Sequence, residues 1–147
     1  MRKDSKEITH HYCGVHNDKM RTVIANVPQG EGRPYINKLV EKGILDSKYK
    51  LTSGYNNTYG RLVENKPSTT ITNNMCCPSA LRCIHYKQNR ELSPREGARI
   101  QSFPDWFIFS GHKSDVTKQI GNAVPPLLSI AIANQIELMF NQYLKGE

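Results

Sequence analysis

The sequence predicts an α+β protein with a small, loop-rich and partly β first part and a helical last third. Two observations support this class. Turn-forming residues punctuate the chain between residues 23 and 75, with short β-type runs among and after them. Beyond residue 90, two segments carry signals for the start of a helix. We therefore divide the chain into a polar lead at 1–22, a first unit at 23–89 and a helical part at 90–147.

The unit at 23–89 holds three predicted elements. Residues 37–42 could form a short helix, which Gly43 would end because glycine readily adopts the left-handed conformation found after a helix. Residues 69–72 and 81–85 are rich in residues that favour extended backbone, and each predicts a short strand. The rest of the unit is expected to form loops.

The first helix of the last third is expected to start at Ser93. Ser93 can cap the helix, Pro94 suits its first turn, and Glu96 completes a capping box three residues after the cap. Pro104 is expected to end this helix, because a proline disfavours helical geometry in the residue before it.

A second, long helix is expected to begin at Ala123 with Asn122 as its N-cap. Pro125 and Pro126 would fall in its first turn, where a missing N–H costs little. Residues 127–133 are apolar except for Ser129, so this helix needs cover on more than one side. A chain of 147 residues is short for supplying that cover alone.

Composition bounds the setting of the protein. The formal net charge of +7 suits a polyanionic partner such as nucleic acid, although a basic protein without such a partner would have the same composition. No apolar leader begins the chain, so the four cysteines are expected to be reduced thiols in a cytoplasmic protein. No uninterrupted apolar run approaches the ~20 residues of a membrane helix, and no membrane partner is expected.

Two segments of the last third form a recognisable pair. Residues 90–105 read RELSPREGARIQSFPD, and residues 119–126 read QIGNAVPP. They resemble the ninth and tenth signature motifs of the cytosine-5 DNA methyltransferases, in the same order and at the usual separation. Upstream, residues 59–62 (YGRL) and 66–72 (KPSTTIT) resemble the C-terminal part of that family's target recognition domain.

The resemblance implies a division of the chain into two parts. Residues 23–89 would be a target recognition domain, and the helices of 90–147 would complete a Rossmann-like methyltransferase domain. The residues to which it assigns roles are Thr70 and Ile71 toward double-stranded DNA; Gly121, Asn122, Ala123 and Val124 toward S-adenosylmethionine; and Arg90, Ser93, Arg95 and Glu96 as a structural motif that positions the recognition domain. Without the resemblance, a plain strand at Thr70–Ile71 and an ordinary capped helix at Asn122 would explain the same residues.

Basic residues of the recognition unit are candidates for contacts to phosphate or guanine. Arg61 is one of them, and the others are Arg21, Arg33, Lys48 and Lys50.

The chain lacks the residues that perform methyl transfer in the family it resembles. Those enzymes use a cysteine in a Pro-Cys pair as nucleophile and a glutamate in a Glu-Asn-Val triplet. Cys77–Pro78 has the reverse order, and Glu64-Asn65-Lys66 matches the triplet only in part and falls in the recognition region. No catalytic residue is therefore assigned, and a catalytic subunit or a missing N-terminal domain is the expected partner.

A cluster of possible metal ligands lies near the N-terminus. His10, His11, Cys13 and His16 fall within seven positions, but structural zinc sites draw on two separated ligand pairs, and no second pair matches this one. A surface histidine cluster is the preferred interpretation, and no metal is predicted.

Three functions stay open at this point. The chain could be one subunit of a split methyltransferase, a C-terminal or inactive fragment of an ordinary one, or a module that only binds DNA. The Gly121–Asn122 segment argues against the third, because a DNA-binding module has no use for a cofactor-pocket segment.

Overall fold

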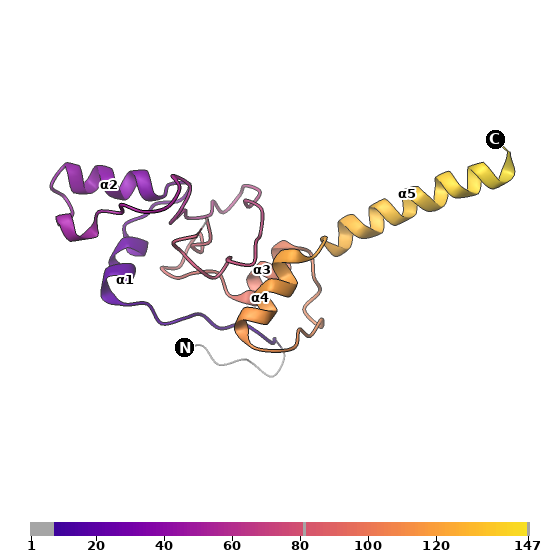
Figure 1. Ribbon diagram of the computed structural model, residues 1–147, viewed down its shortest axis with the longest axis horizontal. Coiled ribbons are helices and arrows are strands. Elements are labelled where there is room, and N and C mark those ends of the chain that lie inside the picture. Colours follow the sequence, from indigo (N-terminus) through magenta and orange to yellow (C-terminus); the bar gives the residue numbers. More distant parts are fainter. Residues whose placement is uncertain (1–7, 81, 147) are drawn as a thin grey trace.

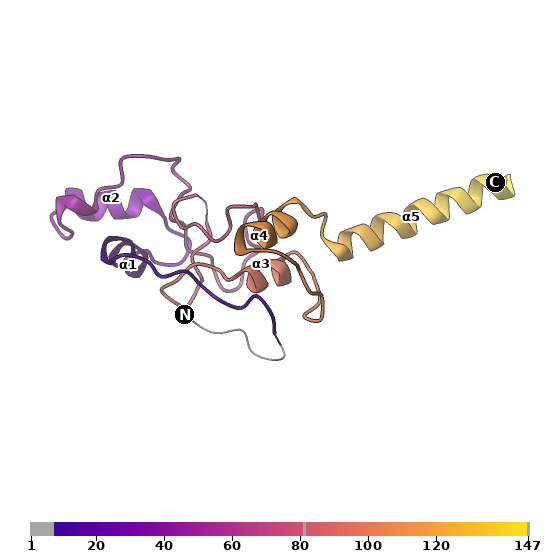
Figure 2. The same ribbon diagram turned by 60° about the horizontal axis from the view of Figure 1, so that its bottom comes forward.

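The computed structural model describes residues 8–80 and 82–146. Its helices are, in chain order, α1 (Asp18–Ala25), α2 (Arg33–Glu41), the 3₁₀ helix η1 (Ser47–Tyr49), α3 (Pro94–Ile100), α4 (Lys113–Asn122) and α5 (Pro126–Lys145). Helices α1 and α2 lie at one end of the molecule, α3 and α4 lie near its centre, and α5 projects away from everything else (Figures 1 and 2).

Strand pairing in the described residues is limited to isolated bridges. Ile84 pairs in parallel with Arg61 and antiparallel with Glu91. This joins three segments at the centre of the chain, in the region of the strand predicted at 81–85, of which Leu81 lies outside the described residues. The strand predicted at 69–72 is wrong: these residues have no ladder partner and run into a turn. Extended propensity forms a strand only where a neighbouring strand supplies hydrogen bonds.

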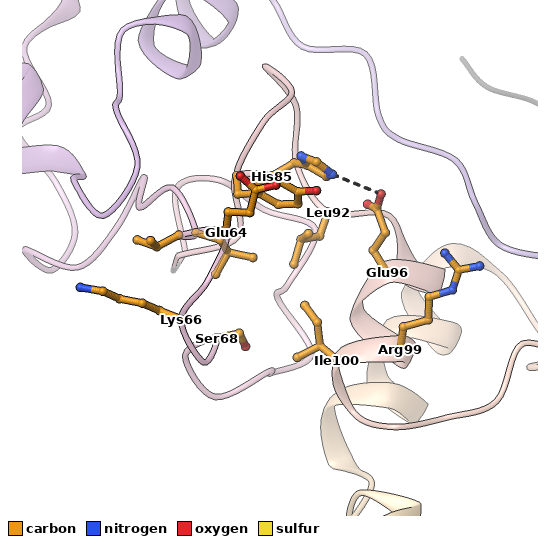
Figure 3. A pocket seen from close by; sticks show the side chains of 11 residues that line it. Glu64, Lys66, Ser68, His85, Leu92, Glu96, Arg99 and Ile100 are labelled. Atoms are coloured by element: carbon orange, nitrogen blue, oxygen red, sulfur yellow. Dashed lines mark ion pairs between the residues drawn. The ribbon is translucent and has the colours of Figure 1, made fainter.

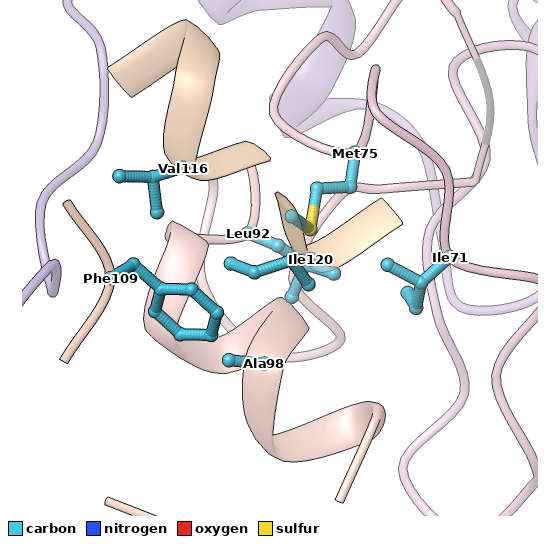
Figure 4. Packing of buried hydrophobic residues seen from close by; sticks show 7 residues of the cluster. All are labelled: Ile71, Met75, Leu92, Ala98, Phe109, Val116 and Ile120. Atoms are coloured by element: carbon cyan, nitrogen blue, oxygen red, sulfur yellow. The ribbon is translucent and has the colours of Figure 1, made fainter. Parts of the chain in front are cut away.

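Two hydrophobic clusters stabilise the fold. The first packs α1, α2 and the centre of the chain, and its buried members are Val23, Ile24, Val27, Ile36, Leu51 and Ile84. The second packs α3 and α4 around the segment that precedes them, and its buried members are Ile71, Met75, Leu92, Ala98, Phe109, Val116 and Ile120 (Figure 4). The two clusters meet at the bridged segments, since Ile84 belongs to the first and Leu92 to the second.

Helix α3 confirms the predicted capping box. The hydroxyl of Ser93 accepts the N–H of Glu96, and the Glu96 carboxylate accepts the N–H of Ser93. The helix ends differently from the prediction. Ser102 adopts a left-handed conformation (φ 64°), and the N–H groups of Ser102 and Phe103 return to the carbonyls of Arg99 and Ala98. This is a Schellman motif, so hydrogen bonding closes the helix before Pro104 is reached.

The predicted start of the last helix is wrong. Asn122 is the last residue of α4 and not an N-cap, and α5 begins at Pro126. The consecutive prolines explain the break, because each disfavours helical geometry in the residue before it. Pro125, which precedes Pro126, is accordingly extended, with ψ of 128°, and Ala123 is also extended, with ψ of 144°. Helix α4 itself was not predicted.

The N-terminal helices also differ from the prediction. Helix α1, which crosses the proposed boundary between residues 22 and 23, begins after Asn17, whose side chain accepts the N–H of Met20. Helix α2 covers the helix predicted at 37–42 and begins at Arg33, with a proline in its first turn. Residues 1–7 of the proposed lead lie outside the described residues.

Beyond its first turns, helix α5 is not covered by any of the described residues. Its apolar residues are about half exposed or more, from Ile132 at 48% to Tyr143 at 80%. By length and composition alone, one stretch of the described residues, 113–144, is long and apolar enough to cross a membrane, but the link at residues 123–125 divides it into α4 and α5. The expectation that no stretch reaches this length is thus wrong by this criterion.

Candidate functional site

The segments assigned to DNA and to the cofactor line one cavity. This cavity has a volume of about 580 Å³, and one wall is formed by residues 67–71. The facing residues come from the end of α3 and the end of α4, namely Ile100, Gln101, Gly121, Ala123 and Pro125. We refer to it as the junction cavity. The structure thus brings together two segments that lie about 50 residues apart in the sequence.

The two residues assigned to DNA differ in exposure. Thr70 is exposed beside the junction cavity, whereas Ile71 is only 7% exposed and belongs to the second hydrophobic cluster. Thr70 can therefore offer its hydroxyl to a ligand, while most of the Ile71 side chain anchors the wall from behind.

The segment assigned to the cofactor follows the C-terminal end of a helix. Gly121 and Asn122 close α4, and Ala123 and Val124 form the link to α5. Asn122 is therefore not at a helix start, where free backbone N–H groups would be available to a ligand. Asn122 and Val124 are nevertheless exposed, Val124 to 59%, so one amide and one branched apolar side chain are available beside the cavity.

The first turn of α5 is capped by Ser102, which lies in the turn that closes α3. The backbone N–H of Leu127 donates to the hydroxyl of Ser102 at 3.1 Å. This bond uses a polar group that is distant in sequence to satisfy one of the free N–H groups of the first helical turn.

Arg61 does not occupy the position of a DNA contact. Its side chain is 5% exposed, and its five N–H donors meet five acceptors within 2.6 to 2.9 Å. The acceptors are the carbonyls of Val27, Ile24, His85 and Gln88 and the side-chain oxygen of Asn89. A guanidinium carries five N–H groups, so none remains for phosphate or guanine. Arg61 instead joins the end of α1 to the 85–89 loop.

Of the other basic candidates, one is used within the fold and the rest lie on the surface. Arg33 donates to the carbonyls of Leu51 and Gly54 and so holds the loop after η1. Arg21 pairs with Asp18 on the surface. Lys48 and Lys50 are exposed, and Lys48 lies 3.9 Å from Asp46.

The motif preceding and opening α3 is a network of paired charges. Arg90 donates two hydrogen bonds to the Glu96 carboxylate, at 2.6 and 2.7 Å. Although burial opposes ionisation, the bonds from Arg90 and from the Ser93 N–H lower the pKa of Glu96 from 4.5 to about 2. Arg95 is fully buried and donates to the backbone carbonyls of Thr9, Pro104 and Phe107. These side chains hold α3 against its neighbours.

One buried carboxylate was not singled out from the sequence. Glu91 is 1% exposed, and its oxygens lie 2.8 Å from Lys113 Nζ, 2.7 Å from His16 Nε2 and 2.8 Å from the N–H of Gly14. It therefore ties the N-terminal segment and α4 to the central bridge. The only sequence signal was its place within the ninth motif.

The histidine cluster is spread over separate partners. The Nε2 of His10 lies 3.0 Å from the Phe109 carbonyl, and the Nδ1 of His11 lies 2.9 Å from the Ser93 hydroxyl. With His16 at Glu91, all three attach the N-terminal segment to the α3–α4 region, so they are not a surface cluster. Within residues 8–80 and 82–146, no three His, Cys, Asp or Glu residues are grouped to hold a metal ion.

A second cavity, of about 310 Å³, lies between residues 62–68 and α3 (Figure 3). His85 Nε2 lies 3.7 Å from Glu96 Oε1 at its edge. Burial and the charge of Arg90 lower the pKa of His85 below its ordinary 6.5, so the imidazole is neutral at pH 7. Of the charged side chains in the cavity lining, His85 pairs with Glu96, whereas Arg99 pairs with Asp105 outside the lining.

The described lining residues of the junction cavity include no cysteine. The four cysteines lie elsewhere, and burial raises the pKa of Cys76 to about 12, which keeps that thiol protonated. The described lining of the cavity therefore offers hydroxyl, amide and apolar groups to a ligand, but no thiol.

Comparison with known proteins identifies the family. A family model described as C-5 cytosine-specific DNA methylase matches residues 2–138. The chain is 46% identical to the type II methyltransferase M1.HphI of Haemophilus parahaemolyticus over 57% of its length and 21% of that protein. It is 36% identical to M.Eco47II of Escherichia coli (78% of this chain, 27% of that one) and 33% identical to DNA (cytosine-5)-methyltransferase 3 of Arabidopsis thaliana (93% and 11%).

The chain thus spans less than a third of these relatives, from 11% to 27% of their lengths. The family model, in contrast, covers nearly all of this chain. On this evidence, the chain belongs to the C-5 cytosine-specific DNA methylases.

Proposed function

We propose that this chain is the C-terminal, DNA-recognising part of a DNA (cytosine-5)-methyltransferase, and that it supplies one side of an active site begun by a catalytic part. The observation that carries the proposal is the junction cavity, which is lined by residues 67–71 on one side and by Gly121 and Ala123 on the other. An enzyme that moves a methyl group from a cofactor to a base must hold the two together, so a shared cavity for both is what this reaction needs.

The DNA side of the proposal rests on exposed groups. Thr70 lies in the lining of the cavity and is exposed. Lys48 and Lys50 are also exposed, in the part of the chain that precedes Thr70. The net charge of +7 favours association with the phosphate backbone. Arg61 is left out of this set, because its donors are all used within the fold.

The cofactor side offers one edge of a binding site. The Asn122 amide can hydrogen-bond a polar group of S-adenosylmethionine, and the Val124 side chain can cover an apolar face. S-adenosylmethionine would supply the methyl group. The described residues of the cavity fit a partial site only, so the remaining contacts would come from the catalytic part.

The catalytic part is also the proposed cover of α5. An apolar surface begins at the 103–108 loop, where Trp106 is 77% and Ile108 is 72% exposed, and it continues along α5. A third cavity, which is apolar and about 440 Å³ in volume, lies between the 103–107 loop and the start of α5, where Pro126 and Leu127 line it. Water would face this whole surface in an isolated chain, at a large hydrophobic cost. Helices α4 and α5 would then complete a Rossmann-like domain, which gives the α+β architecture.

The test is reconstitution. The chain is produced with and without the catalytic part of a cytosine-5 methyltransferase, encoded upstream of it, and methylation of duplex DNA is measured with labelled S-adenosylmethionine. Activity is expected only when both are present. Methylation by the 147-residue chain alone, or DNA binding with no activity in any combination, would refute the proposal.

A matched pair of variants tests the role of α5. Ile132→Glu should abolish co-purification with the catalytic part, because it buries a charge in the proposed interface. Ile44→Glu makes the same change at an exposed isoleucine after α2 and should leave co-purification intact.

A further inference from the structure

Two helical glycines contact the turn that follows residues 67–71. These residues form the wall of the junction cavity assigned to DNA, here called the DNA-facing wall, and Gly121 and Ala123 belong to the opposite, cofactor-facing wall. The turn comprises residues 72–76, directly after Ile71. Gly97 of α3 lies against the Met75 side chain, and Gly121 of α4 lies against the backbone of Thr72 and Asn73. Ile71 and Met75, on either side of this turn's start, both pack in the second cluster with Ile120 (Figure 4).

Neither glycine is required by backbone conformation. Both have ordinary helical φ values, and glycine destabilises a helix relative to alanine. The space around them supplies the reason. A Cβ at residue 121 would lie 2.2 Å from the Asn73 nitrogen and 2.4 Å from the Thr72 carbonyl carbon, and one at residue 97 would lie 2.1 Å from the Met75 sulfur.

The two contacts differ in how easily they could adjust. At Gly121 the obstacle is backbone, so the helix and the turn would have to separate by about 1 Å to restore ordinary contact. At Gly97 the obstacle is the end of a flexible methionine, so the contact can adjust more easily, but Met75 is packed in the second cluster and its movement would disturb that packing.

We propose that Gly97 and Gly121 are positioning residues that set the distance between the DNA-facing wall and the cofactor-facing wall of the junction cavity. This rests on the proposed function. Gly121 immediately precedes Asn122 and Ala123, and Thr72 immediately follows Ile71. Contact between Gly121 and Thr72 therefore joins the two walls directly, without an intervening side chain, and a displacement of α4 against the turn changes the spacing between base and cofactor.

The experiment combines a kinetic and a structural readout. In the reconstituted methyltransferase, Gly121→Ala should lower kcat about 100-fold, the cost of a displacement of about 1 Å, while KM for DNA and for S-adenosylmethionine changes little. In the same complex, amide hydrogen exchange across residues 67–77 should become faster. Lys118→Ala, on an exposed position of α4, is the control and should change neither readout.

A double-mutant cycle separates positioning from loss of folding. Gly97→Ala should accelerate exchange in the same segment, but adding it to Met75→Ala should have no further effect, because the clashing sulfur is gone. Asn73→Ala should not rescue Gly121→Ala, since the obstacle there is backbone.

The outcomes distinguish this inference from the proposed function. An inactive wild-type complex refutes the function and with it the active-site role of the glycines. An active wild-type complex in which Gly121→Ala retains normal kcat and normal exchange overturns the positioning role alone. Additive effects of Gly97→Ala and Met75→Ala would overturn it equally.

Discussion

Helices α4 and α5 follow each other in the chain yet meet opposite environments. Helix α4 buries Val116, Thr117 and Ile120 against α3 and the 71–75 segment. Helix α5 is twice as long and more apolar, but leaves its large apolar side chains exposed. The contrast indicates that the two helices belong to different hydrophobic cores. The core used by α4 is present in this chain, and the core proposed for α5 belongs to a catalytic part.

Replacement of Arg61, in the packed interior of the fold, should have the largest effect on the free energy of unfolding. Arg61→Ala leaves four backbone carbonyls and one amide oxygen without their donor, and should lower the free energy of unfolding by about 3–5 kcal/mol. Urea unfolding followed by circular dichroism measures this. Arg61→Lys should recover only a fraction of the loss, because an ammonium cannot reach five acceptors. A cost below about 1 kcal/mol, as expected for a surface arginine, would contradict the structural role.

The same substitution in the two helices tests the contrast directly. Ile120→Ala in α4 empties part of a packed cluster and should cost about 2–5 kcal/mol of unfolding free energy. Ile132→Ala in α5 removes a side chain that is 48% exposed and should cost less than about 0.5 kcal/mol in the isolated chain. Equal costs would show that α5 is covered within this chain. In the reconstituted complex, the cost at Ile132 should rise.

A pH dependence is expected from Glu96 in the packed region. Its pKa falls from 4.5 to about 2 on folding, so the stabilisation is present above pH 4.5 and is lost as the pH falls toward 2. After allowance for solvent screening, this amounts to about 2 kcal/mol. Glu96→Gln should remove this part of the difference in urea stability between pH 6 and pH 3. Asp105→Asn, at a solvent-exposed ion pair, should leave the difference nearly unchanged.

The smallest effect on stability is expected at Ser102, where the α3–α4 region meets α5. Ser102→Ala removes the acceptor for the Leu127 N–H and should cost about 1 kcal/mol. Hydrogen exchange at the first turn of α5 should quicken, while exchange within α4 stays the same. Acceleration in both helices would mean that α5 and α4 unfold as one unit.

Much of the local structure could be predicted from the sequence. The capping box at Ser93 and Glu96 depends on contacts three residues apart, and it was found. The Asn17 cap of α1 was equally local, but no apolar period in the polar lead drew attention to it. At Asn122 two local signals competed. A capping residue suggested a helix start, and the two prolines after it determined that the chain is extended there instead.

The partners of the buried charges could not be predicted. Arg61 and Glu91 are ordinary charged residues in the sequence, and on average such residues are exposed. Their acceptors and donors come from positions between 22 and 77 residues away. No local pattern encodes such pairs, which is why Arg61 was assigned to DNA.

The sequence by itself determined the family and the identity of the two motif segments, because those depend on residue order alone. It also determined the helix-start signal at Ser93, whose energetics are local. Only the tertiary structure decided that residues 67–71 line one cavity with Gly121 and Ala123, that Arg61 serves the fold, and that the described residues leave most of α5 uncovered. These features arise from packing between distant segments, and packing depends on which surfaces meet after the chain has folded.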